Sequence, residues 1–101
     1  MHPDEKRRIE RNVLRKQWDA TIPEFLPGDY QFDIWLNRYS YIACEAGIER
    51  TVILADKKRN AGTPMDSDYL LRYASACMRN KHLEILDNDA RRARQVQNGV
   101  R

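Results

Sequence analysis

Apolar residues recur every three or four positions in four separate segments of the chain, the spacing of helices that bury one side. The first segment, Asp4 to Ala20, places Ile9, Val13, Leu14 and Trp18 near one side of a helix whose other faces are charged. Pro23 and Pro27-Gly28 then interrupt the pattern, because proline restricts its own φ and disfavours helix in the residue before it. We therefore predict a first amphipathic helix that docks loosely, followed by an irregular connector.

The second and third segments predict two helices that follow each other closely. Asp29 can cap a helix in which Phe32, Trp35, Leu36 and Tyr39 match the amphipathic spacing without exception. Ser40 can cap the next helix, from Tyr41 to about Arg59. Its predicted apolar side consists of Ile42, Ala43, Ala46, Ile53 and Leu54, widened by Ile48, Val52 and Ala55. We expect this helix to be the most buried.

The fourth segment follows the strongest break in the chain, residues 60–64, where glycine and proline come after a basic last turn. Asp66 can cap a helix in which apolar residues come in adjacent pairs every four positions, interrupted at Lys81-His82. From Asn88 onward arginine dominates, and we expect a frayed or disordered tail.

These patterns predict an all-α fold: a compact bundle of about four helices with a basic, flexible C-terminal extension. Residues 1–87 would form a single helical domain and residues 88–101 a basic tail. The predicted core consists of Trp18, Phe32, Trp35, Leu36, Ile42, Ala46, Ile53, Leu70, Ala74 and Cys77.

Composition narrows the class of protein. A chain of 101 residues has room for one core, and its net charge of +3 permits contact with phosphates without requiring it. The two cysteines fall in apolar helical patterns, which predicts reduced core thiols. The chain has no apolar run of the ~20 residues that a membrane span needs, and its charged start lacks the apolar stretch of a signal peptide. We expect a cytoplasmic protein that contacts no membrane.

The inventory of reactive groups argues against catalysis. His2 lies at a terminus and His82 on a polar stretch, and helix capping explains Asp66 and Asp68. The sequence has neither a glycine-rich phosphate loop nor the histidine and cysteine spacing of a metal site. We expect no enzyme activity, no catalytic residue, no metal and no cofactor.

Gly47 admits two interpretations. Together with Ile42, Ala43 and Ile48 it matches the small and apolar positions of a helix-turn-helix unit, in which glycine bends the chain before a recognition helix. The alternative is one continuous helix in which Gly47 permits close packing, at a cost of about 1 kcal/mol relative to alanine. We favour the continuous helix, because the later apolar position of the helix-turn-helix pattern falls on Asp56.

The order of features from Asp29 to Lys81 resembles the DnaD-like helical domain of bacterial primosome proteins and phage replisome organisers. The matching features are Trp35, a polar break at Asn37-Arg38, a helix with Ile42, Ala46, Arg50, Thr51 and Val52, a Gly62-Thr63-Pro64 loop, and Tyr69-Leu70-Leu71 opening the next helix. The family often carries Tyr-x-x-x-Ile-x-x-x-Trp in its last helix, where this chain has Tyr69, Tyr73 and Cys77. The resemblance implies a replication-associated adaptor that contacts DNA and a helicase or helicase loader.

Phosphate contacts in such an adaptor would come from clustered basic residues. The candidates are Lys57, Lys58, Arg59, Arg72, Arg79, Lys81, Arg91, Arg92 and Arg94. The alternative function is a small protein–protein interaction module, of the kind that phages encode, which binds no nucleic acid. Exposed aromatic residues among Tyr30, Tyr39, Tyr41 and Tyr73 would suit it. Either function is compatible with a homo-oligomer.

Overall fold

The computed structural model describes the backbone of residues 2–99 and the side chains of residues 2–95. These residues form four helices: α1 (Pro3–Thr21), α2 (Asp29–Arg38), α3 (Tyr41–Asn60) and α4 (Ser67–Gly99). Strands are absent from this described part of the chain. The predicted all-α, four-helix fold class is confirmed.

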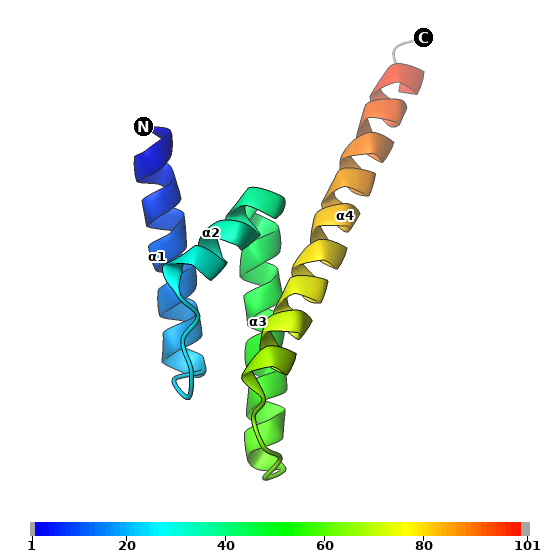
Figure 1. Ribbon diagram of the computed structural model, residues 1–101. Helices are drawn as coiled ribbons and strands as arrows, with labels where there is room; N and C mark the ends of the chain where they lie inside the picture. The colour runs from blue at the N-terminus through cyan, green and yellow to red at the C-terminus, as the bar shows by residue number, and fades with distance from the viewer. Residues whose placement is uncertain (1, 100–101) are drawn as a thin grey trace.

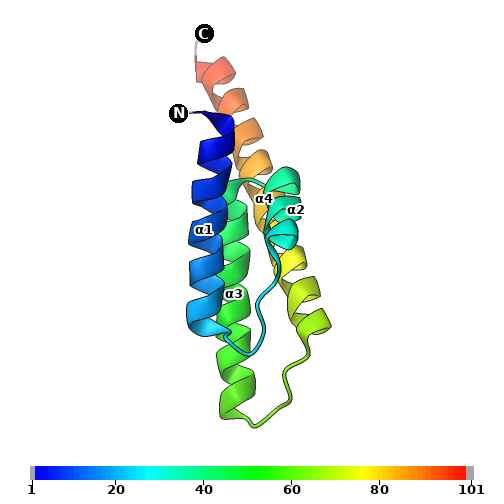
Figure 2. The ribbon, with the colours of Figure 1, turned by 60° about the vertical axis from the view of Figure 1, so that its left-hand side comes forward.

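The helices form a flat bundle that measures 18 Å along its shortest axis and 59 Å along its longest. Figures 1 and 2 show α3 between α1 and α4, with the short α2 crossing one face of this layer. The C-terminal half of α4 rises clear of the other helices (Figure 1). Among residues 2–99, no helix covers the opposite face of the α1–α3–α4 layer.

Three aromatic rings form the centre of the core. Trp18, Phe32 and Trp35 are at most 1% exposed, and the rings of Trp18 and Phe32 lie 6.0 Å and 5.7 Å from that of Trp35. Each indole N–H donates a hydrogen bond, at 2.9 Å from Trp18 to the carbonyl of Phe25 and at 2.8 Å from Trp35 to the hydroxyl of Ser75. The core prediction is confirmed for Trp18, Phe32, Trp35, Leu36, Leu70 and Ala74.

The predicted buried side of α3 is confirmed for Ala43, Ile48 and Ala55, which are fully buried, and is wrong for its other core candidates. Ile42 and Ile53 are 65% and 51% exposed, and Ala46 and Cys77 are only half-buried. The side of α3 that packs in the core instead carries a row of small residues every four positions, Ala43, Gly47, Thr51 and Ala55. Small side chains allow two helices to approach closely, and α4 packs against α3 more extensively than against any other helix.

Gly47 lies where α3 and α4 are in close contact. A Cβ atom added there would lie 3.0 Å from the carbonyl oxygen of Ala74 and from the backbone nitrogen of Met78 on α4. α3 runs without a break through Gly47, which confirms the continuous helix and excludes the helix-turn-helix interpretation. Glycine is therefore required here for packing between helices.

α1 is docked more firmly than its thin apolar stripe predicts. Leu14 and Trp18 are fully buried, although Ile9 and Val13 are 44% and 42% exposed. Three polar pairs between successive turns of α1 and α2 add to this contact: Arg7 with Asn37 at 2.6 Å, Arg11 with Asp33 at 3.2 Å and Arg15 with Asp29 at 2.6 Å. Two arginines of α1, Arg11 and Arg15, are thus paired with carboxylates of α2.

The junction between α2 and α3 is held by a residue that the sequence pattern places on an exposed polar stretch. The backbone N–H of Ser40 donates a hydrogen bond to Nδ1 of His82 at 3.2 Å, and the His82 ring lies edge-on to Tyr39 at 5.7 Å. His82 is half-buried, and its role is structural, because it accepts a hydrogen bond from a backbone N–H at the start of α3.

The predicted basic C-terminal extension is present beyond the bundle, and its described backbone is helical. α4 continues as a helix to Gly99, and every side chain described from Leu86 to Gln95 is exposed. Good helix formers and an Asp87–Arg91 ion pair at 3.2 Å, four residues apart, favour the helical backbone. Residues 100–101 of the predicted tail lie outside the described residues.

Among residues 2–99, no helix combines the length and the apolarity that spanning a bilayer requires.

Candidate interaction surfaces

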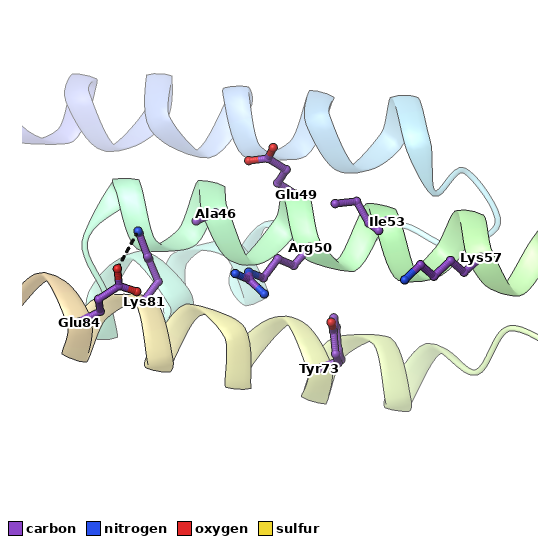
Figure 3. Close-up of a pocket in the computed structure, with 8 residues that line it drawn as sticks. All are labelled: Ala46, Glu49, Arg50, Ile53, Lys57, Tyr73, Lys81 and Glu84. Atoms are coloured by element: carbon purple, nitrogen blue, oxygen red, sulfur yellow. Dashed lines mark hydrogen bonds and ion pairs between the residues drawn. The ribbon is translucent and has the colours of Figure 1, made fainter.

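A groove of about 620 Å³ runs between α3 and α4 on the face that carries Ile53 (Figure 3). We call it the α3–α4 groove. Its lining consists of Ala46, Glu49, Arg50, Ile53 and Lys57 of α3 and Tyr73, Lys81 and Glu84 of α4. Because α3 and α4 are held together by the close contact at Gly47, both walls of the groove are fixed by the core of the bundle.

The lining of the α3–α4 groove is weakly positive. Arg50, Lys57 and Lys81 outnumber Glu49 and Glu84 by three charges to two. Lys81 forms an ion pair with Glu84 at 3.5 Å, whereas Arg50 and Lys57 project from α3 two turns apart (Figure 3). Arg50 and Lys57 are both exposed, so an anionic ligand can reach their side chains without any rearrangement of the bundle.

Two tyrosines stand beside these cations. The rings of Tyr69 and Tyr73 are stacked with centroids 6.4 Å apart, and the ammonium of Lys58 lies 4.9 Å from the centroid of Tyr69. Burial, and next the neighbouring thiol of Cys77, raise the pKa of Tyr73, and Arg50 opposes them. Tyr73 therefore keeps its proton at neutral pH and can donate a hydrogen bond into the groove.

The structure brings together only part of the predicted set of basic residues. Lys57 and Lys81 line the α3–α4 groove, and Lys58 lies beside it on Tyr69. Arg50 lies in the same groove but was not among the predicted phosphate contacts. Its spacing of seven residues from Lys57, two turns of one helix face, is the signal that could have identified it.

Arg59 is engaged in contacts within the protein. Its guanidinium bonds Glu24 at 2.7 and 3.0 Å and Asp56 at 2.7 Å, and it also donates to the carbonyl of Thr21. These bonds tie the end of α3 to the end of α1 and the connector that follows. A phosphate would have to compete with two carboxylates for this side chain.

The remaining predicted residues are spread over other surfaces. Arg72 lines a separate groove between α2 and α4 together with Arg38, and Arg79 is exposed on α4. Arg91, Arg92 and Arg94 lie on the exposed extension, where Arg91 is paired with Asp87. No single face collects all nine predicted residues.

A second kind of surface is aliphatic. Ile42, Ala46 and Ile53 follow one another at spacings of four and seven, which places Ile42 on the same side of α3 as the groove residues. Ile42 is 65% and Ile53 is 51% exposed. Exposed aliphatic side chains in a row on one helix are typical of a surface that contacts another protein.

Reactive groups are few on the described surface. No group of three or more histidine, cysteine or acidic side chains among the described residues is placed to hold a metal ion. Burial raises the pKa of the Cys44 thiol to about 12, so this thiol stays protonated. Cys77 is half-buried rather than a core thiol, and its side chain lies beside Arg50 and Lys81.

The Glu24–Arg59 pair predicts a specific acid sensitivity. The hydrogen bonds from Arg59 hold the pKa of Glu24 below its ordinary 4.5. A carboxylate whose pKa is lower in the folded state contributes stability above its unfolded pKa and loses it as pH falls through the folded value. Glu24→Gln should therefore lower the melting temperature near neutral pH, and the difference from the parent should shrink below pH 4.5.

Thermal denaturation of parent and variant across this pH range checks that expectation. Glu49→Gln, which neutralises an exposed carboxylate on α3, is the control and should leave the pH profile close to that of the parent. A constant difference between Glu24→Gln and the parent at every pH would contradict the lowered pKa.

Comparison with known proteins gives no family for this chain: no family model matches it, and neither a curated protein nor a solved structure matches it.

Proposed function

We propose that this protein is a non-catalytic cytoplasmic adaptor of a DNA-replication assembly, which contacts DNA through the α3–α4 groove and also binds a helicase or helicase loader. The observation that carries the DNA contact is the convergence of Arg50 and Lys57 from α3 with Tyr73 and Lys81 from α4 in one groove. The DnaD-like pattern, which runs through α2, α3 and the first half of α4, supports the replication setting.

The chemistry of the groove suits a sugar–phosphate backbone. Exposed cations neutralise phosphates and release counterions, which is the main source of affinity in non-specific DNA binding. Tyrosine adds a hydrogen-bond donor and an aromatic face. With only two cations of the groove free of a carboxylate partner in the described structure, Arg50 and Lys57, we expect weak binding with a shallow salt dependence.

The second candidate function is a protein–protein interaction module that binds no nucleic acid. The exposed row of Ile42 and Ile53 on α3 favours it, because isoleucine side chains gain more from an apolar partner than from phosphate. In the adaptor the protein partner would contact the part of this row outside the groove, at Ile42, so the two functions differ in whether DNA is bound at all.

The deciding experiment is a titration of the full chain with single- and double-stranded DNA at two salt concentrations. We expect Arg50→Ala with Lys57→Ala to weaken binding and to lower the salt slope by roughly one unit per lost phosphate contact. The matched variant replaces Arg91, Arg92 and Arg94 with alanine on the extension, and it measures any contribution of a basic arm.

A larger loss in the groove variant than in the extension variant supports the α3–α4 groove as the DNA site. Equal binding by the groove variant and the parent would remove the groove from the proposal. If the parent binds neither form of DNA even at low salt, the protein–protein interaction module becomes the better account.

A further inference from the structure

α4 carries a second apolar row that the bundle does not use. The row that packs against α3 contains Leu70, Ala74 and Met78. A helix turns about 100° per residue, so Leu83, Leu86, Ala90 and Ala93 lie on another side of α4, roughly 140° away from that row. We call these four residues the outer α4 seam. Leu83 and Leu86 are 51% and 52% exposed, and both alanines are exposed as well.

The spacing of the outer α4 seam is that of a coiled coil. Its members follow at intervals of three, four and three residues, which assigns Leu83 and Ala90 to heptad position a and Leu86 and Ala93 to position d. The charged residues between them fall beside the seam or opposite to it. A helix with this pattern buries its seam against another helix of the same kind, and in the described structure nothing covers it (Figure 1).

We infer that the outer α4 seam binds a second copy of this chain, as a parallel, in-register pair of α4 helices. Only two registers place all four seam residues of one copy against the four of the other. One is parallel and in register, and the other is antiparallel and centred between Leu86 and Ala90. The charges beside the seam distinguish the two.

In the parallel arrangement position g of one helix faces the following position e of its partner. Asp89 occupies position g and Arg94 the following position e, so each copy offers Asp89 to Arg94 of the other, and the pair forms twice. In the antiparallel arrangement position e faces e and g faces g. Asp89 would then face its own copy, which is a repulsive contact. Asp87 would also face its own copy, with its charge partly offset by Arg91 of the same helix. Charge therefore selects the parallel pair.

The position of the seam also permits this dimer. The seam points away from the side of α4 that contacts α3, so the two bundles would lie on opposite outer sides of the helix pair. Tyr73 and Lys81, which line the α3–α4 groove, are on a different side of α4 from Leu83. With two leucines and two alanines in each seam, the association is weak and depends on concentration. The inference does not depend on the proposed DNA contact.

Sedimentation equilibrium of the full chain at increasing concentration tests the dimer. The mass should rise from 12.0 kDa toward twice that value. Replacing Leu83 and Leu86 together by aspartate should abolish the rise, because charges would occupy both leucine layers. Ile53→Asp is the matched control, since Ile53 is 51% exposed but lies on α3, and it should dimerise like the parent.

The register has its own test. Asp89→Arg alone, and Arg94→Asp alone, should each weaken the dimer by roughly tenfold, because both symmetric pairs become repulsive. The variant with both changes restores the pairs in reversed polarity and should recover the parental association. A mass of 12.0 kDa at all concentrations, or disruption by Ile53→Asp but not by the leucine variant, overturns the inference. A double charge variant that associates no better than the single variants overturns the parallel register.

Discussion

Replacing Trp35 with alanine is expected to lower the free energy of unfolding by about 3–5 kcal/mol. Trp35 is 1% exposed, and its ring lies between those of Trp18 and Phe32, which belong to α1 and α2. Its N–H also bonds Ser75 on α4, so the one side chain joins three helices. A small domain has about 5–15 kcal/mol of total stability, and this loss would leave much of the variant close to unfolding.

Urea denaturation of the parent and Trp35→Ala measures the effect. Trp35→Phe keeps most of the apolar volume but removes the N–H donor, and Ser75→Ala removes the acceptor at 2.8 Å. The hydrogen bond is expected to contribute about 1 kcal/mol, so both controls should be much milder than alanine. A parental midpoint for Trp35→Ala would contradict the burial of this side chain.

The helices themselves could be predicted from the sequence because their ends depend on local signals. The predicted third helix began at Tyr41, as α3 does, since the Ser40 hydroxyl accepts from the N–H of Ala43. The loop after it contains Gly62 with φ of 68°, a left-handed conformation that glycine adopts without strain. Such signals involve residues within a few positions of each other, so one sequence is enough to find them.

The orientation of α3 could not be predicted, because its apolar residues surround the helix. Ile42 and Ile53 suggest one buried side, and Cys44 and Ile48 suggest another. The contact with α4 decides between them, since only the side with Gly47 allows the helices to approach so closely. Ile42 and Ile53 therefore led the prediction to the wrong side of α3. The small residues in the row that contains Gly47 determine which side packs against α4.

The candidate site was predicted only in part for a similar reason. Lys57 was identified from charge along the chain, but whether a cation is available depends on partners far away in the sequence. Arg59 meets Glu24, 35 residues earlier, and Arg11 meets Asp33, 22 residues later. Counting charges cannot reveal such pairs, and so it treated Arg59 and the exposed Lys57 as equivalent.

The second large effect is expected from Gly47→Ala, which should lower the free energy of unfolding by about 1–3 kcal/mol. Helix propensity alone predicts the opposite sign, because alanine is favoured over glycine by about 1 kcal/mol in a helix interior. The added Cβ, however, would clash with the Met78 side chain and would lie only 3.0 Å from each of two backbone atoms of α4. Backbone atoms cannot yield unless α4 moves away from α3, and these two helices share the largest contact in the bundle.

Chemical denaturation of Gly47→Ala shows whether the free energy of unfolding falls or rises, and two further variants identify the cause of the change. Gly28→Ala places a Cβ where no atom lies within 4 Å, so it tests alanine without a steric clash. Any loss of stability there comes from the preference for glycine over alanine at the N-cap of α2, and it should be smaller. In a Met78→Ala background the substitution at Gly47 should cost less than in the parent, because the nearest side-chain atom has been removed. Part of the cost should remain, since the backbone atoms of Ala74 and Met78 are still in place. A Gly47→Ala variant more stable than the parent would show that propensity outweighs the contact, and that α3 and α4 are less tightly packed than the structure describes.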